Sequence, residues 1–173
     1  MAQIVPPLPV VDVARGIASL DADIPRVLAF LGKSTIEELG WRRPNKSSLI
    51  IPLQGTFNGV TEQYLLRLGF SAYRGWPPSA QFVNPETLAY THPMDQHHLP
   101  MLSSPECHVH PSYGSANGKT LQLICCSATQ EFYDAAHPVE SDLMWREQNT
   151  FYTTIAAIQK AMVMHYGGRF AKV

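Results

Sequence analysis

The stretch Ser47-Ser-Leu-Ile-Ile-Pro-Leu53, the turn residues Gly55-Thr-Phe-Asn-Gly59 and the run Tyr64-Leu-Leu-Arg-Leu-Gly-Phe70 decide the fold class of this chain. In the last run every second residue is large and apolar, with Arg67 between them, and this alternation predicts a strand with one buried face. The first run is short and apolar, which is typical of a second strand. Turn residues between two such runs predict a β-hairpin.

A helix is expected before this hairpin. From Val10 to Leu31 apolar residues recur at helical spacing. Pro25 excludes one unbroken helix, unless it occupies the first turn of a second segment with Asp23 near its cap. We therefore expect one or two short amphipathic helices packed on a sheet.

A second helix is expected near the end of the chain. Apolar residues from Phe151 to Met162 recur at i, i+4, i+7 and i+11. Asn149 is a candidate cap, and Gly167-Gly168 is a candidate stop signal.

The middle of the chain predicts further strands over Ala80 to Val83 and Thr120 to Cys126, separated by a long irregular loop over residues 88–117. A loop of that length inside a compact domain is usually functional. The order helix, strands, loop, helix predicts an α+β fold: an antiparallel meander sheet with a helix at either end. We expect a single domain over residues 1–173, in which residues 1–9 form a proline-rich extended leader.

Composition excludes several classes of function. The 173 residues carry a net charge of −1, with 45% hydrophobic residues. There is no basic excess to bind nucleic acid or an anionic membrane surface. No apolar run approaches the roughly 20 residues that span a bilayer, and the start of the chain does not resemble a secretory signal. We therefore expect neither a nucleic-acid nor a membrane partner, and a cytoplasmic location. Three cysteines, two of them adjacent, predict reduced thiols rather than a disulfide framework.

Three segments, Pro52-Leu-Gln-Gly-Thr-Phe-Asn-Gly-Val60, Tyr64-Leu-Leu-Arg-Leu-Gly-Phe-Ser-Ala-Tyr73 and Gly75-Trp-Pro-Pro-Ser-Ala-Gln-Phe82, resemble the core of the ubiquitin-conjugating enzyme family. The family shows a glycine-threonine turn, an alternating strand, a tyrosine-containing loop, a Pro-Pro pair and a short strand in this order. The resemblance implies a ubiquitin-conjugating-enzyme-like fold and a cysteine that carries a ubiquitin-like protein as a thioester. It implies two partners, a ubiquitin-like modifier and its activating enzyme.

These segments are most similar to family variants from bacterial ubiquitination-like operons, which act in anti-phage defence. In such operons a deconjugating peptidase is a further partner. The family's cysteine follows a histidine-proline-asparagine motif and a short strand. His110-Pro111-Ser112 stands before the strand that ends in Cys125 and Cys126. The resemblance therefore implies a catalytic role for His110 and for one of these two cysteines, although Ser112 replaces the asparagine and the spacing is longer.

Two arguments about the nucleophile disagree. Strand alternation puts Leu121, Leu123 and Cys125 on one face, which looks buried, so it favours Cys126 as the exposed nucleophile. Alignment of an isoleucine-cysteine pair with the family favours Cys125. We adopt Cys126 as the working hypothesis.

Other residues are candidates for supporting roles. Asn117 is the nearest amide that could stabilise an oxyanion, although Asn117-Gly118 is also an ordinary turn dipeptide. His137 and Asp134 are candidates to steer or deprotonate an incoming amine. The other acidic residues of this segment, Glu131 and Asp142, look like solvated loop charges, and Tyr133 and Trp145 are expected to pack the loop after the cysteines.

A metal site is the weaker interpretation of Cys107, His108 and His110. Their spacing, even with His97-His98 added, is tighter than that of an ordinary structural zinc site, and we expect no metal and no cofactor. We expect instead that His108 and His110 hold the loop around the cysteine strand.

Two other functions stay open: an inactive family variant that docks a ubiquitin-like protein, and a cysteine hydrolase using His137. The cysteine-hydrolase interpretation gives the Pro-Pro segment no role. The family's docking surface for the activating enzyme implies that Arg15, Arg26 and Trp76 lie near that partner.

Overall fold

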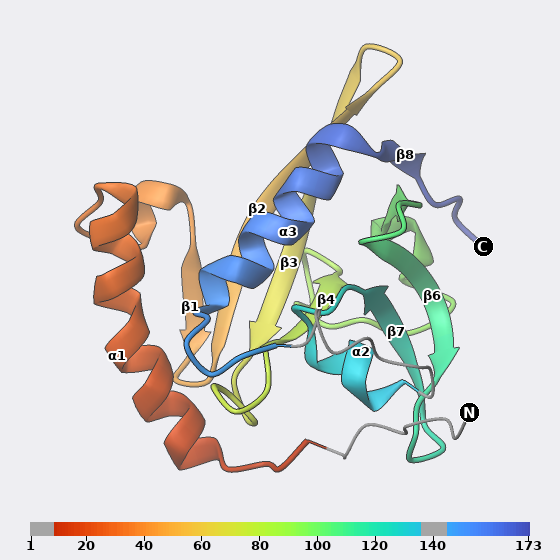
Figure 1. The fold of residues 1–173 in the computed structure, drawn as a ribbon. Helices are drawn as coiled ribbons and strands as arrows, with labels where there is room; N and C mark the ends of the chain where they lie inside the picture. Colours follow the sequence, from red (N-terminus) through yellow and green to blue (C-terminus); the bar gives the residue numbers. More distant parts are fainter. Residues whose placement is uncertain (1–8, 136–144) are drawn as a thin grey trace.

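The computed structural model describes residues 9–135 and 145–173. Its main sheet has four antiparallel strands in the order β1-β2-β3-β4 (Figure 1). They are β1 (Arg42–Asn45), β2 (Ser48–Phe57), β3 (Val60–Gly69) and β4 (Ser79–Val83). The predicted α+β class and antiparallel meander are confirmed, but the fourth strand differs. Strand β1 was not predicted, and the predicted strand over Thr120 to Cys126 lies outside this sheet, in a separate two-stranded sheet.

The predicted β2–β3 hairpin is confirmed with a tighter turn than expected. Phe57 pairs with Val60, so only Asn58 and Gly59 form the turn, with φ values of 50° and 76°. An Asn-Gly pair in the left-handed region is the preferred two-residue hairpin connection. The apolar face that alternation predicted, from Tyr64 to Phe70, is buried in the core.

Helix α1 (Val13–Leu31) is a single helix that contains Pro25, so the predicted break at this residue is wrong. Asp12 caps its start by accepting the Arg15 N–H at 3.0 Å. A buried stripe continues on both sides of Pro25, which itself faces solvent, and this packing overrides the local preference for a break. The stripe consists of Gly16, Leu20, Asp23, Val27 and Leu28.

Helix α3 (Phe151–Met164) lies across the main sheet, while α1 flanks the sheet beside β1 (Figure 1). Thr150, not Asn149, occupies the N-cap position. Gly167 and Gly168 do not stop the helix, which ends earlier; they lie in β8 (Tyr166–Arg169). A short 3-10 turn, η1 (Glu37–Leu39), connects α1 to β1.

The predicted irregular loop over residues 88–117 is wrong in part, because it contains a 3-10 turn and two strands. These are η2 (Gln96–His98), β5 (Pro100–Leu102) and β6 (His108–Gly114). Strand β5 pairs with β8, and β6 forms an antiparallel hairpin with β7 (Thr120–Cys125). The alternation of His108, Val109 and His110 is typical of a strand, but the prolines around it favoured a loop.

The β6–β7 hairpin is joined to the main sheet by a side chain. Gln122 Oε1 accepts the Phe82 N–H at 2.7 Å, and Gln122 Nε2 donates to the Phe82 carbonyl at 2.9 Å. The amide thus forms the pair of hydrogen bonds that another strand would form with the edge of β4.

Helix α2 (Gln130–Asp134) follows β7. In the described part of the chain, no helix combines the length and the apolar character needed to span a membrane.

Candidate functional site

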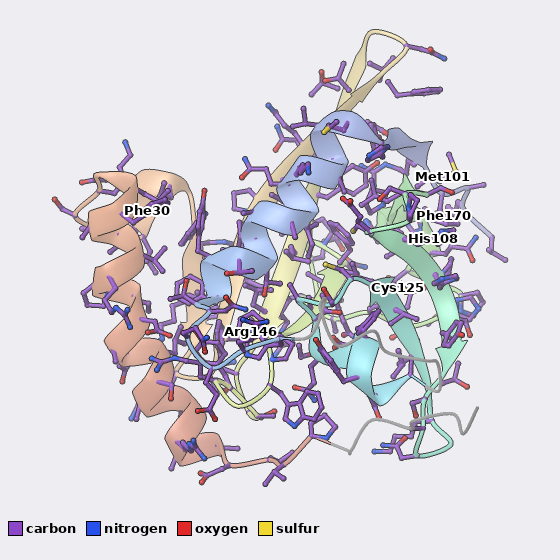
Figure 2. All side chains as sticks on the ribbon, in the orientation of Figure 1. Phe30, Met101, His108, Cys125, Arg146 and Phe170 are labelled. Atoms are coloured by element: carbon purple, nitrogen blue, oxygen red, sulfur yellow. The ribbon has the colours of Figure 1, made fainter. Side chains whose placement is uncertain are left out.

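The β6–β7 hairpin brings the three cysteines together. His108 at the start of β6 is the direct partner of Cys125 at the end of β7, and Figure 2 labels both side chains on this hairpin. Cys125 is half-buried, whereas Cys107 and Cys126 are only 2% and 4% exposed. Cys125 is therefore the most accessible of the three thiols.

The expectation that Cys126 is the exposed cysteine is wrong. The inner face of β7 carries Gln122 and Ile124, and Cys126 follows them into the core, where Val109 of β6 also packs. Alternation does not separate a buried from an exposed face here, because Leu123, on the same face as Cys125, is also only 1% exposed. The polar side chain of Gln122 is more typical of an exposed face. It is nevertheless buried, because its amide forms hydrogen bonds with the backbone of β4.

A row of aromatic side chains lies beside Cys125. The rings of His108 and His110 stack at 4.3 Å with an angle of 19° between their planes, and the Tyr113 ring lies 5.1 Å from His110. A bulge between His110 and Tyr113 shifts the pairing with β7 there. The two histidines were predicted to hold a loop around the cysteine strand; instead they lie in strand β6, paired with Cys125 and Leu123 of β7.

The three thiols differ in their acidity. Burial, followed by the neighbouring Cys126, raises the pKa of Cys125. Hydrogen bonding between the thiols of Cys107 and Cys126 lowers the pKa of Cys126 and, together with burial, raises the pKa of Cys107. Cys125 is therefore mainly a neutral thiol near pH 7, and its attack on a carbonyl requires a base or an activated acyl donor.

Asn117 does not lie beside the cysteines. It sits with Gly118 in the turn that connects β6 to β7, whereas Cys125 lies at the open end of the hairpin. Its Oδ1 accepts the Lys119 N–H at 3.3 Å and also contacts the Ser115 hydroxyl. Gly118 has a φ of 81°, so the turn-dipeptide interpretation describes this pair.

The acidic residues after the cysteines have different environments. Glu131 is buried, not a solvated loop charge as expected; its carboxylate accepts the Ser79 hydroxyl and, at 3.0 Å, the Ala80 N–H. Burial raises its pKa to about 7. Asp134 is half-buried at the end of α2. His137 and Asp142 lie outside the described residues.

Tyr133 and Trp145 pack the segment after the cysteines, as predicted. The Tyr133 hydroxyl donates to the Ser127 carbonyl at 2.7 Å and accepts the Trp145 N–H at 2.6 Å. The Trp145 indole donates to the Arg74 carbonyl at 2.9 Å. Trp76 is half-buried, with its ring 4.7 Å from that of Tyr133, so it is shared between this packing and the surface.

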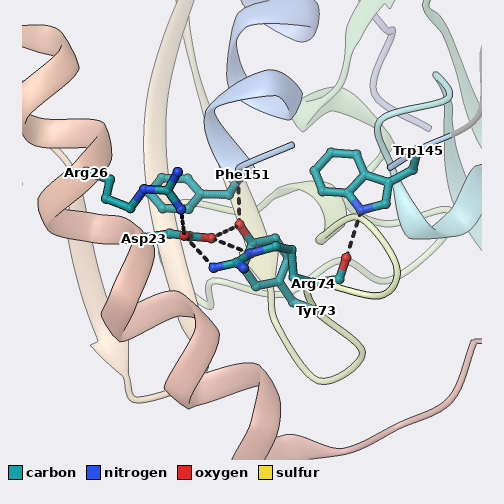
Figure 3. Close-up of polar contacts among 6 residues, drawn as sticks. All are labelled: Asp23, Arg26, Tyr73, Arg74, Trp145 and Phe151. Carbon is teal, nitrogen blue, oxygen red and sulfur yellow. Dashed lines mark hydrogen bonds and ion pairs between the residues drawn. The ribbon is translucent and has the colours of Figure 1, made fainter. Parts of the chain in front are cut away.

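The carboxylate of Asp23 connects α1 to the segment that contains Tyr73 and Arg74 (Figure 3). The sequence analysis placed Asp23 near a helix cap, but it lies within the buried stripe of α1. Asp23 is fully buried, accepts the Tyr73 hydroxyl at 2.5 Å, and is held by Arg74 Nε at 3.0 Å and Nη2 at 2.6 Å. Tyr73 in turn accepts the Phe151 N–H at 2.9 Å. An acidic residue within the apolar stripe, between Leu20 and Val27, was the available signal for this cluster.

The described residues contain no group of three His, Cys, Asp or Glu side chains that could hold a metal ion. A cavity of about 520 Å³ between α1 and α3 is lined by Phe30 and Tyr152, away from the cysteines. A smaller cavity of about 160 Å³ lies over Cys107.

Comparisons of the chain with protein-family models, curated proteins and solved structures find no match.

Proposed function

We propose that the chain is a ubiquitin-conjugating-enzyme-like carrier in which Cys125 holds a ubiquitin-like modifier as a thioester. The observation that supports this most is the position of Cys125: a half-exposed thiol at the end of β7, on a hairpin fixed to the edge of an antiparallel meander. Burial of Cys126 moves the nucleophile assignment from Cys126 to Cys125.

The chemistry is two successive acyl transfers. The Cys125 sulfur attacks the thioester carbonyl of a loaded activating enzyme, loses its proton, and displaces the activating enzyme's cysteine as a thiolate. An amine on a target then attacks the new thioester and displaces Cys125. A raised thiol pKa is compatible with this role, because the acyl group arrives already activated. His108, the cross-strand partner of Cys125, is the nearest candidate for receiving its proton.

A catalytically inactive docking module for a ubiquitin-like protein is the second candidate. Two observations favour it: burial raises the pKa of Cys125, and the predicted amide, Asn117, lies at the other end of the hairpin. In that case the meander and α1 form a binding surface, and Arg15 and Arg26, both exposed on α1, belong to it.

A loading assay tests the proposal. Wild type, Cys107→Ala, Cys125→Ala and Cys126→Ala are incubated with the cognate activating enzyme, ATP and modifier, then run on reducing and non-reducing gels. We expect a thiol-sensitive band in wild type that only Cys125→Ala abolishes. Cys107→Ala and Cys126→Ala are the matched controls. Absence of the band in wild type, with the modifier still bound, supports the docking module instead.

A further inference from the structure

Cys107 and Cys126 lie opposite each other at the open end of the β6–β7 hairpin. The β6–β7 ladder ends at the antiparallel pair His108–Cys125, and continuing its register by one residue brings Cys107 and Cys126 to facing positions. Facing Cα atoms in antiparallel strands lie about 4.5–5.5 Å apart, within the ~4.4–6.8 Å that a disulfide spans. Both side chains point into the core, and they are 2% and 4% exposed.

The two thiols interact, and hydrogen bonding between them raises the pKa of Cys107 and lowers the pKa of Cys126. The thiolate is the form of cysteine that reacts with oxidants. Cys125 belongs to the opposite face of the hairpin, where burial and the neighbouring Cys126 raise its pKa.

A cavity gives a small oxidant access to Cys107, one member of the pair. It has a volume of about 160 Å³, and Cys107 lines it together with Glu106, Lys160 and His165. One water-sized molecule needs roughly 10–15 Å³ of such volume, so hydrogen peroxide fits. The backbone around Cys107 is held in place: its N–H donates to Ser104 Oγ at 2.9 Å, and the same hydroxyl donates to the Cys107 carbonyl at 3.2 Å.

We propose that Cys107 and Cys126 form a peroxide-sensitive dithiol that closes to an intramolecular disulfide. The thiolate of one cysteine of the pair attacks one oxygen of hydrogen peroxide, the O–O bond breaks, and the departing hydroxide takes a proton to become water. The sulfur of the other cysteine then attacks the sulfur of the resulting sulfenic acid, the S–O bond breaks, and hydroxide leaves with the proton of the second thiol as a second water. Two thiols are oxidised by two electrons and one peroxide is reduced.

The disulfide leaves Cys125 free. It connects the residue before β6 to the residue after β7, so oxidation closes the end of the hairpin on which Cys125 lies without consuming that thiol. This inference does not depend on the acyl-transfer proposal, because neither bridged cysteine is assigned a role there.

Peptide mapping of the peroxide-treated full chain tests the proposal. After oxidation, unfolding and alkylation, we expect two of the three thiols to be protected in wild type and all three to be free again after dithiothreitol. Cleavage by trypsin at Arg74, Lys119 and Arg146 puts Cys107 on one peptide and both Cys125 and Cys126 on the next. The disulfide therefore appears as one cross-linked pair of peptides.

Variants identify the sulfur atoms. Cys125→Ala should keep the cross-linked pair and lose the one remaining free thiol, whereas Cys107→Ala and Cys126→Ala should each lose the pair. Because wild type and Cys125→Ala already decide the assignment, the proposal stays testable if a core variant fails to fold. Loss of the cross-link in Cys125→Ala, disulfide-linked dimers in place of the internal link, or three free thiols in oxidised wild type would each overturn it.

Discussion

The side-chain amide of Gln122 in β7 forms both of its hydrogen bonds with the backbone of Phe82 in β4, at 2.7 and 2.9 Å. Both residues are buried, so neither backbone group has water as an alternative partner. This pairing connects the hairpin that carries the cysteines to the main sheet. The orientation of Cys125 therefore depends on a glutamine that carries out no chemistry itself.

Replacement of Gln122 by leucine should destabilise the fold. The change leaves the N–H and C=O of Phe82 unpaired in the core, and each unsatisfied group costs about 1–3 kcal/mol. We expect the free energy of unfolding, measured in urea, to fall by about 2 kcal/mol or more. Gln159→Leu, on the exposed side of α3, is the control and should change it by less than about 0.5 kcal/mol. Equal effects of the two variants would show that the Gln122 pairing contributes nothing.

Replacement of Asp23 by asparagine should be more harmful than the same change at Asp21, two residues earlier in α1. Asp23 is fully buried and pairs with Arg74 at 2.6 Å, whereas Asp21 pairs with Arg43 at 2.7 Å with its side chain 55% exposed. Breaking a buried pair costs about 3 kcal/mol, and breaking an exposed pair costs less than about 1 kcal/mol. Urea unfolding of the two variants compares them directly. A larger loss in Asp21→Asn would contradict the assignment of Asp23 as the central carboxylate of this cluster.

Glu131 should make the protein less stable as the pH rises. Burial raises its pKa from 4.5 to about 7 in the folded chain. Between these values the unfolded state has lost the proton and the folded state still holds it, so stability falls as the pH rises through this window. The full effect is up to about 3 kcal/mol.

Glu131→Gln removes the titrating group and keeps an oxygen that can accept the Ala80 N–H. Urea unfolding of wild type and this variant at pH 5 and pH 8 separates its contribution from that of the histidines, which both proteins share. We expect a smaller fall in stability between these pH values in the variant. Parallel pH profiles would contradict a raised pKa at Glu131.

The sequence predicted the β2–β3 hairpin because β3 alternates cleanly and the Asn58-Gly59 turn is a strong local signal, but it did not predict β1. It did not predict the unbroken α1, since tertiary packing on both sides of Pro25 overrides a local rule. It also did not predict β6, because the prolines in and around this segment favoured an irregular loop over the short alternation of His108, Val109 and His110.

The candidate site was predicted only in part. The two adjacent cysteines were found, but their faces were exchanged, because Gln122 appeared to belong to solvent until its partner on β4 was known. The Asp23 cluster joins α1, the β3–β4 connection and the start of α3. Contacts across such separations leave no local periodicity in a single sequence.

Cys125 should be the cysteine that alkylating reagents modify first in the folded protein. It is half-buried, while Cys107 and Cys126 are almost fully buried. Because its pKa lies above the usual value, we expect the rate with iodoacetamide to be low at pH 7 and to keep rising through pH 9, as the thiolate fraction increases. Mass spectrometry after short reaction times measures the labelled position. Cys125→Ser is the control, and the fast adduct should disappear in it. Initial labelling at Cys126 would show that its lower pKa outweighs its burial, and would return the nucleophile assignment to that residue.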